Sequence, residues 1–418
     1  LLRRSALPPG RAEANARRLR LALEVLGPAF VKLGQCLAAR EDVLSDGVVK
    51  ELRKLCDQVP PFPHHLAREL VEEELGGAAP RDLGKVVAAA SLGQVFRVVV
   101  DGQAYAMKVQ RPGIAHAIAQ DVSILRGLAA SMRRVVRCFT EMLVDPVEVV
   151  DNWALTMWGE LDYEKEARSM EQFQRSLAKI RGLVIPSVNW ELTTTRVLTS
   201  EWVDGVKVTD QPKSVRTDHI AIGVQTFASM ILEVGAVHAD PHAGNMLLVG
   251  DAVCLLDFGM VIQVPPAHRG AWAKVIVHLV RKEHEALLDG LITLGFFPVD
   301  CPRHEILPVM SKIWLKLVEC GSDIHKRKIA VQELSDEIAT FVRRFRFNLP
   351  DYYVALARAL VTLEGIALAA QCDFDIFAAI FPVCARFLAR EAGGGAEGAA
   401  GLRWALAGEG ARCAARAA

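Results

Sequence analysis

The stretch His238-Ala-Asp-Pro-His-Ala-Gly-Asn245, followed by Leu255-Leu-Asp-Phe-Gly259, decides the fold. It places Asn245 five residues after Asp240, and Asp257 stands at the end of a short hairpin that turns at Gly250-Asp251. Phosphoryl transfer requires an acid group near the acceptor and two oxygen ligands that hold magnesium against the phosphates. Each segment alone is weak evidence. Their order and spacing, with a hairpin between them, together indicate this chemistry.

A second hairpin, upstream, supplies a lysine. Residues 95–100 and 103–109 flank Asp101-Gly102, which is a strong two-residue turn signal because glycine tolerates a positive φ. Alternation along the second strand puts Lys108 on the same face as two alanines, Ala104 and Ala106. A lysine on such a small face can reach a phosphate. The downstream segments favour this role over that of a surface lysine at a sheet edge.

The segment Ala88-Ala-Ala-Ser-Leu-Gly-Gln-Val95 precedes this hairpin, where protein kinases carry a glycine-rich loop. It contains a single glycine, Gly93. The Cβ of alanine restricts φ and keeps the backbone away from a phosphate. The loop therefore argues against an ordinary protein kinase.

Helical patterns surround these segments. Apolar residues recur at steps of three and four from Leu19 to Leu37, on one predicted helix face that Gly27-Pro28 divides into two helices. Two further helices are expected after Ser45 and from about Pro63 to Gly76-Gly77. Strands are expected near residues 182–186 and 196–203, and helices from Pro265 to about Arg390.

Composition narrows the class of protein. The 49 Lys and Arg residues balance the 49 Asp and Glu residues, so no overall charge favours nucleic acid. The nine cysteines include no C-x-x-C pair, which predicts neither a disulfide framework nor a zinc site and fits a reducing compartment. No apolar run is long enough to predict a membrane span.

The start of the chain is basic and does not begin with Met. The arginine-rich first 20 residues predict a solvated helix face, with contact to an anionic membrane as the alternative. Because the chain begins with Leu1 rather than Met, we expect a fragment or processed form whose targeting segment is not visible.

Taken together, these segments resemble the UbiB-like atypical kinase family, whose members are linked to isoprenoid quinone and lipid metabolism. The matching pieces follow the family order over residues 20–385. They are Lys32-Leu-Gly-Gln35, the loop at 88–95, Lys108, Glu160-Leu-Asp-Tyr-Glu-Lys-Glu166, Ser200-Glu-Trp-Val203 and the two segments quoted first.

The resemblance implies an α+β, bilobal, protein-kinase-like fold. Residues 1–80 would form an N-terminal helical extension, and residues 81–203 an N-lobe that carries a helical insert. Residues 204–390 would form a mostly helical C-lobe. The Ala- and Gly-rich residues 391–418 are predicted to be a disordered tail.

The resemblance also implies ATP and Mg²⁺ as cofactors. Asp240 would be the catalytic acid, Lys108 would bind phosphates and pair with Glu166, and Asn245 and Asp257 would ligate the metal. The nucleotide would further contact the backbone at Glu201 and Val203 and the loop residues Ala88, Ala89, Ala90, Ser91, Gly93 and Val95.

Four residues form a predicted gate: Lys32, Gln35, Glu160 and Asp162. Glu160 and Glu166 are six positions apart, or about 240° around a helix, so we expect them to have different partners. Glu166 would face Lys108. Glu160 would face the Lys32 helix, which in the family packs over the place where a protein kinase receives its peptide.

The predicted activity is Mg-ATP binding with slow hydrolysis, or transfer to a small or lipid-like acceptor. Ala239, where protein kinases carry Arg, and the absence of an A-P-E segment argue against protein substrates. Two alternatives stay open: a small-molecule kinase of the aminoglycoside or choline type, and a nucleotide-sensing scaffold without transfer. An organelle is expected, with the Asp-Pro-His form of the catalytic loop favouring a plastid over a mitochondrion. The acceptor and the oligomeric state are left open.

Overall fold

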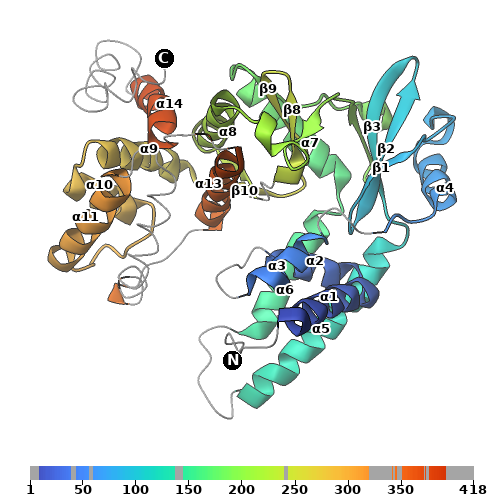
Figure 1. Cartoon of the computed structure of the whole chain (residues 1–418), viewed down its shortest axis with the longest axis horizontal. Coiled ribbons are helices and arrows are strands. Elements are labelled where there is room, and N and C mark those ends of the chain that lie inside the picture. The colour runs from blue at the N-terminus through green and yellow to red at the C-terminus, as the bar shows by residue number, and fades with distance from the viewer. Residues whose placement is uncertain are drawn as a thin grey trace. The chain divides into compact units, whose positions relative to one another are not determined.

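The computed structural model describes residues 9–38, 44–55, 60–136, 145–239, 243–319, 341, 344–345, 351–370, 372 and 376–391. The chain forms two compact units (Figure 1). The first unit comprises Leu1–Met170 and Ser187–Trp202, and the second comprises Glu171–Pro186 and Val203–Ala418. Except for Glu391, the predicted tail at 391–418 lies outside the described residues.

The first unit opens with helices α1 (Pro9–Leu26), α2 (Pro28–Ala38), α3 (Asp46–Arg53) and α4 (His64–Leu75). Gly27 separates the first two with a φ of 135°, and Pro28 is the first residue of α2, as predicted. The predicted apolar stripe is partly wrong, because Leu19 and Leu26 are 41% and 54% exposed. Both lie in α1, to one side of the helix face that Ala16 and Leu23 bury. Leu23 is therefore the residue of this part of the stripe that joins the cluster of Phe30, Val31, Leu52 and Leu55.

Gly34 allows these helices to approach closely. A Cβ at this position would lie 2.5 Å from Leu55 Cδ1 and 2.9 Å from Leu23 Cδ1. Leu55 follows α3 and Leu23 belongs to α1, so the glycine lies where α2 meets both neighbours. The glycine of the Lys32–Gln35 segment therefore has a packing role.

A four-stranded antiparallel sheet follows, in the order β1-β2-β3-β5. Its strands are β1 (Val86–Ala89), β2 (Gly93–Val100), β3 (Gln103–Gln110) and β5 (Val197–Glu201). The turn between β2 and β3 has positive φ at both Asp101 and Gly102, which confirms the predicted hairpin. One face of the sheet packs against α4 through Phe96, Met107 and Val109.

Helices α5 (Ile114–Val136), α6 (Pro146–Gly159) and α7 (Tyr163–Leu177) connect β3 to the next strands. The first two are the insert that the long interval between Lys108 and Glu166 predicts. Asp145 caps α6 by accepting a hydrogen bond from the Val147 N–H at 2.9 Å. The boundary between the two units falls within α7, between Met170 and Glu171, so this helix belongs partly to each unit.

The second unit contains two small sheets. One has the order β4-β9-β8-β6, and the other pairs β10 with β7. The strands are β4 (Leu183–Val184), β6 (Val206–Lys207), β7 (Ala236–His238), β8 (Met246–Val249), β9 (Ala252–Leu255) and β10 (Val261–Gln263). The β8–β9 hairpin confirms the signal at Gly250-Asp251, whereas β7 and β10 are too short to give a period and were missed.

The helices of this unit are α8 (Thr217–Ser229), α9 (Pro266–Val280), α10 (His284–Thr293), α11 (Arg303–Glu319), α13 (Asp351–Ala370) and α14 (Ile376–Glu391). Short 3-10 turns occupy Gly76–Ala78, Trp190–Leu192, Pro212–Ser214 and Ala243–Asn245. In the described ranges, no helix has both the length and the hydropathy needed to cross a bilayer.

A π-helical turn, Met230–Val234, leads from α8 into β7. Gly235 ends it with a φ of 75°. Arg269, on α9, donates hydrogen bonds to the carbonyl oxygens of Leu232 at 2.9 Å and Glu233 at 3.0 Å. These bonds satisfy carbonyl groups that the end of a helix leaves open, and so they fix the chain that enters the His238–Asn245 segment.

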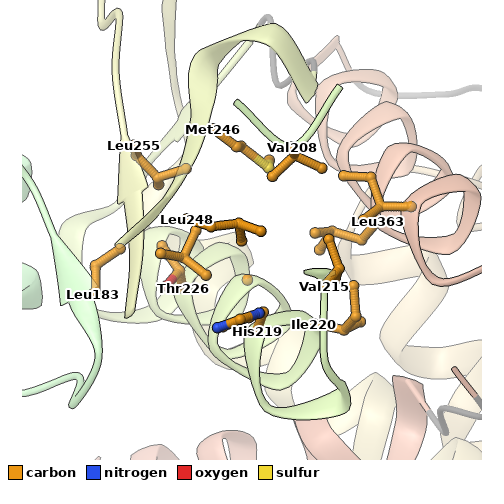
Figure 2. A pocket seen from close by; sticks show the side chains of 13 residues that line it. Leu183, Val208, Val215, His219, Ile220, Thr226, Met246, Leu248, Leu255 and Leu363 are labelled. Atoms are coloured by element: carbon orange, nitrogen blue, oxygen red, sulfur yellow. The ribbon is translucent and has the colours of Figure 1, made fainter. Parts of the chain in front are cut away.

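An apolar cavity lies between α8, the β8–β9 hairpin and α13 (Figure 2). Aliphatic side chains such as Ile220, Leu248 and Leu363 line it. His219 is the most polar side chain in the lining, and both of its ring nitrogens are hydrogen-bonded to the backbone. Nδ1 accepts from the Arg216 N–H and Nε2 bonds to the Gly250 carbonyl, each at 3.1 Å. The cavity is therefore a gap in the core packing of this unit.

Candidate functional site

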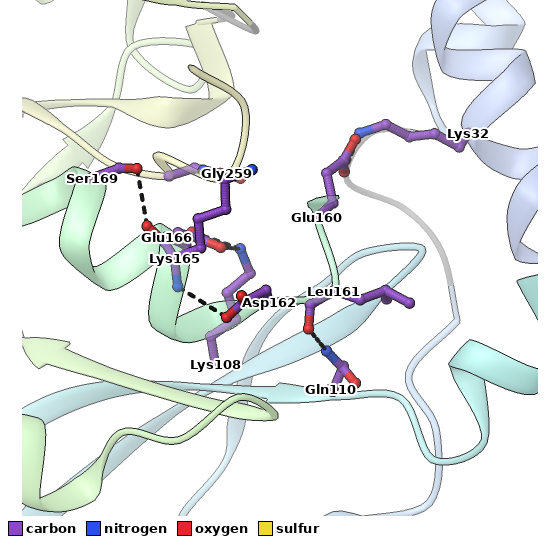
Figure 3. Close-up of polar contacts among 11 residues, drawn as sticks. Lys32, Lys108, Gln110, Glu160, Leu161, Asp162, Lys165, Glu166, Ser169 and Gly259 are labelled. Atoms are coloured by element: carbon purple, nitrogen blue, oxygen red, sulfur yellow. Dashed lines mark hydrogen bonds and ion pairs between the residues drawn. The ribbon is translucent and has the colours of Figure 1, made fainter. Parts of the chain in front are cut away.

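Lys108 and Glu166 form the central ion pair of the first unit (Figure 3). The Lys108 Nζ donates to both Glu166 carboxylate oxygens at 2.8 Å. Glu166 is only 3% exposed and Lys108 25%, so the lysine keeps some access to solvent while its partner is buried. The ammonium also lies 4.9 Å from the centre of the Tyr163 ring. The predicted partnership of these two residues is present.

The alanine-rich loop is a tight turn. Ala88 and Ala89 belong to β1, Val95 belongs to β2, and only residues 90–92 connect the strands. The Ala90 N–H donates to the Gly93 carbonyl at 2.8 Å, and Ser91 is buried. A Cβ on Gly93 would lie 2.5 Å from the Val109 oxygen and 2.7 Å from the Tyr163 hydroxyl. Close packing of backbone and tyrosine thus requires the one glycine of the loop.

Two residues that the sequence reading missed hold this loop. The Arg111 N–H donates to the Leu92 carbonyl at 2.8 Å, and its guanidinium donates to the Pro60 carbonyl at 3.1 Å and lies over the Phe62 ring. Burial lowers the pKa of Arg111. Gln94 accepts a hydrogen bond from the Phe62 N–H at 3.2 Å. The loop is thereby tied to the segment that precedes α4.

Lys32 reaches a second carboxylate, on the turn between α6 and α7. Its Nζ donates to Glu160 Oε2 at 2.7 Å, and the two side chains are 12% and 10% exposed (Figure 3). Asp162 has a different role, because its Oδ1 accepts from the Lys165 N–H at 3.0 Å and caps α7. Gln35 also points elsewhere, donating to the Leu55 carbonyl at 2.7 Å.

The premise that one helix carries both glutamates is wrong. Glu160 follows the end of α6, and Glu166 lies in the first turn of α7. Residues 160–162 form a turn between these helices, and Asp162 starts the second one. The two glutamates have different partners because they lie on different elements, not because of their angle around one axis.

The predicted adenine segment, residues 201–203, spans the point where the chain passes from the first unit to the second. The Glu201 N–H donates to the Ser187 carbonyl at 2.8 Å, and the Trp202 N–H donates to the Ala104 carbonyl at 3.2 Å. Both N–H groups are therefore bonded to backbone carbonyls of the first unit. The chain passes into the second unit between Trp202 and Val203.

The second unit contains the two predicted metal ligands. The Leu256 N–H donates to the Asn245 carbonyl at 2.9 Å, so the backbone of Asn245 adjoins the segment that carries Asp257. Asp257 has a left-handed backbone with a φ of 62°, and its Oδ1 accepts from the Gly259 N–H at 3.1 Å. Carboxylate and amide oxygens suit a hard cation such as Mg²⁺. Asp240 lies outside the described residues.

Three buried rings pack in a row beside these ligands. The ring centres of His238 and Phe258 are 5.6 Å apart, and those of Phe258 and Phe173 are 5.2 Å apart. The row joins the His238–Asn245 segment, the Leu255–Gly259 segment and α7. Phe173 was missed because it lies in an ordinary amphipathic helix without a motif.

The structure groups the predicted residues by unit. Lys108 with Glu166, Lys32 with Glu160, and the alanine-rich loop belong to the first unit, while Asn245 and Asp257 belong to the second. In the described ranges, no group of three or more His, Cys, Asp or Glu side chains is placed to hold a metal ion.

Several known proteins are similar to this chain. It is 34% identical over 391 residues to the uncharacterized protein sll0005 of Synechocystis, and 33% identical over 395 residues to the chloroplastic protein ACTIVITY OF BC1 COMPLEX KINASE 3 of Arabidopsis thaliana. Each match covers 91% of this chain but only 56% and 55% of the relatives, so the chain spans about half of their length. The probable protein kinase UbiB of Marinobacter nauticus is 29% identical over 87% of this chain and 68% of its own length.

A solved structure shares the fold. The complex of Rv3197 with erythromycin from Mycobacterium tuberculosis matches with a TM-score of 0.58 and 22% identity, covering 88% of this chain and 95% of that one. Residues 54–290 match the ABC1 atypical kinase-like domain. These matches confirm the predicted kinase-like α+β fold. The chain belongs to the ABC1 atypical kinase-like family.

Proposed function

We propose that this chain binds Mg-ATP and either hydrolyses it slowly or transfers its γ-phosphoryl group to a small, lipid-like acceptor. The pairing of Lys108 with the buried Glu166, through two hydrogen bonds of 2.8 Å, carries this proposal. A lysine held in this way presents its ammonium at a fixed place for phosphate oxygens. The backbone at Glu201 and Val203 and the loop at 88–95 would complete the nucleotide contacts.

In the second unit, Asp257 and Asn245 would hold Mg²⁺. When bound, the ion would supply the positive charge that offsets the phosphates, which a neutral amide and an anionic carboxylate cannot supply. Asp240 would accept the proton of the acceptor hydroxyl or of water. An acid at that position supports turnover over the alternative of a nucleotide-sensing scaffold, because binding alone needs no proton acceptor.

The Lys32–Glu160 contact supports a non-protein acceptor. Both side chains are largely buried, so the α2 helix is held in place by a pair that is costly to break from one side. Kinases of the aminoglycoside or choline type lack these elements. The resemblance to UbiB-like kinases points to isoprenoid-quinone or related lipid chemistry, and the chloroplastic Arabidopsis relatives favour a plastid over a mitochondrion.

The test follows the γ-phosphate. The purified chain is incubated with γ-labelled ATP, Mg²⁺ and a lipid extract, and free phosphate, extractable label and protein label are separated. Label as free phosphate or on an extractable molecule supports the proposal, provided that Lys108→Met abolishes it. Binding of ATP without release or transfer would favour the scaffold instead. Label on added protein substrates would contradict the proposed acceptor class.

A further inference from the structure

The Lys32–Glu160 and Lys108–Glu166 pairs are connected at the end of β3. Gln110, the last residue of this strand, is 4% exposed. Its Nε2 donates to the Leu161 carbonyl at 2.7 Å (Figure 3). Its backbone N–H donates to the Arg196 carbonyl at 3.0 Å, which fixes Gln110 in the sheet. Leu161 lies between Glu160, the partner of Lys32, and Asp162, the cap of α7.

The glutamine is suited to this position. A partly buried carbonyl that loses its donor is destabilising, and the Leu161 carbonyl, in the turn between α6 and α7, accepts from the Gln110 side chain. Lys108 and Gln110 alternate to the same side of β3. One strand face therefore binds Glu166 through a lysine and the 160–162 turn through a glutamine.

We propose that Gln110 is a positioning residue that couples the Lys32–Glu160 pair to the Lys108–Glu166 pair through the Leu161 carbonyl. That this coupling would affect ATP turnover rests on the proposed function, in which Lys108 binds ATP and the Lys32 helix restrains the site. With Gln110 in place, Glu160 meets Lys32 and Asp162 starts α7 at the correct residue. Without it, the turn relaxes and the hold of Glu160 on α2 weakens.

Hydrogen exchange of the backbone amides tests the coupling directly. Gln110→Met keeps the length of the side chain but removes its donor. The matched control is Gln174→Met, because Gln174 makes the same kind of bond, from Nε2 to the Ile185 carbonyl at 2.8 Å, away from the turn. We expect exchange in residues 28–38 and 159–163 to rise about fivefold in Gln110→Met, which equals the value of one hydrogen bond, about 1 kcal/mol.

The control should leave exchange in residues 28–38 at the parental rate. Parental exchange in these residues in Gln110→Met would overturn the proposal. A rise of equal size throughout β2 and β3 would also overturn it, since that pattern reports a general loss of stability. If Gln110→Met does not fold, Gln110→Asn, whose amide is too short to reach Leu161, replaces it.

A double variant separates positioning from packing. Lys32→Ala should by itself accelerate exchange in residues 28–38, and the addition of Gln110→Met should accelerate it no further, because both act through one pair. Additive effects would overturn the coupling. The exchange measurements that test the coupling require no nucleotide. If Mg-ATP does not change the exchange of the parental chain, the proposed function is refuted. The result on the coupling is unaffected by that outcome.

Discussion

The Asp121 carboxylate, on α5, accepts a hydrogen bond from the Ala29 N–H, in the first turn of α2, at 3.1 Å. Asp121 is only 7% exposed, so one helix supplies the cap of another. Gly27 makes room for it, since a Cβ there would lie 2.6 Å from Asp121 Oδ2. The helix that carries Lys32 is thus anchored at its start by a residue far away in the sequence.

The first prediction concerns the pH dependence of this anchor. Burial raises the pKa of Asp121 above its usual 3.8, although the bond from Ala29 opposes the shift. The folded state then holds a proton that the unfolded state has lost, so stability falls as the pH rises from the ordinary pKa through the raised one. Asp121→Asn keeps the acceptor oxygen without the charge. It should flatten this part of the profile and raise stability at pH 7.

Urea unfolding between pH 3.5 and 7 measures this effect. Asp121→Ala is the control, because it removes the acceptor and should cost about 1 kcal/mol, as for a lost helix cap. An Asn variant as unstable at pH 7 as the Ala variant would show that the charge is required.

The second prediction concerns Lys108 and Glu166. Removing one partner of a buried pair costs about 3–5 kcal/mol, and less here because Lys108 is partly exposed. Lys108→Met with Glu166→Leu should therefore cost well below the sum of the single changes, by about 1–3 kcal/mol in unfolding free energy. The exposed α7 pair Glu164 and Arg168 serves as control and should be additive within about 0.5 kcal/mol. Additivity at Lys108 and Glu166 would argue against the contact.

The third prediction concerns the metal ligands. Asp257→Asn removes a negative oxygen ligand, so Mg-dependent ATP affinity should fall at least about tenfold, or about 1.4 kcal/mol. Calorimetry with and without Mg²⁺ measures it. Asp251→Asn, in the exposed turn of the same hairpin, should bind like the parental chain. Unchanged Mg dependence in Asp257→Asn would remove Asp257 from the site.

The fourth prediction concerns the gate. Lys32→Ala should raise ATP turnover or self-phosphorylation about tenfold, because α2 loses its contact with Glu160. Ala89→Gly should act in the same direction by loosening the end of β1. Lys50→Ala, on an exposed position of α3, is the matched control. Parental turnover and self-phosphorylation in Lys32→Ala would rule out gating.

The fifth prediction compares two helical glycines. In Gly223→Ala, the new Cβ would meet Leu363 Cδ2 at 2.8 Å, and this side chain can shift into the apolar cavity that it lines. Because alanine has a higher helix propensity than glycine, this change should then stabilise the second unit by about 0.5–1 kcal/mol. In Gly34→Ala the new Cβ would meet two side chains at once, Leu55 at 2.5 Å and Leu23 at 2.9 Å, and should destabilise by about 1–3 kcal/mol. Thermal unfolding measures both, and stabilisation by Gly34→Ala would contradict the packing.

Local signals in the sequence predicted a large part of this fold. The Asp101-Gly102 turn and the strand alternation around Lys108 depend on neighbouring residues only, and both are present. The kinase-like fold followed from the order of the motifs. The start of α7 was missed although Asp162, followed by Glu164 and Glu166, is a typical helix start.

The remaining features depend on contacts that no local pattern encodes. Gln110 and Asp121 are polar residues whose partners, Leu161 and Ala29, lie far away along the chain. Each partner is a backbone group, a carbonyl or an N–H, of a kind that nearly all residues possess and no motif identifies. The reason for Gly34 is likewise visible only once α1 and α3 are placed around it.

The tied alanine-rich loop has a consequence for the entropy of the proposed nucleotide binding. Its three connecting residues are closed by the Ala90–Gly93 bond and held by Arg111. A flexible glycine loop loses backbone entropy when it orders over phosphates, at about 1–2 kcal/mol per residue. A loop that is already ordered has little left to lose. Nucleotide association here should carry a small conformational entropy penalty, and its affinity would be limited by poor phosphate contacts instead.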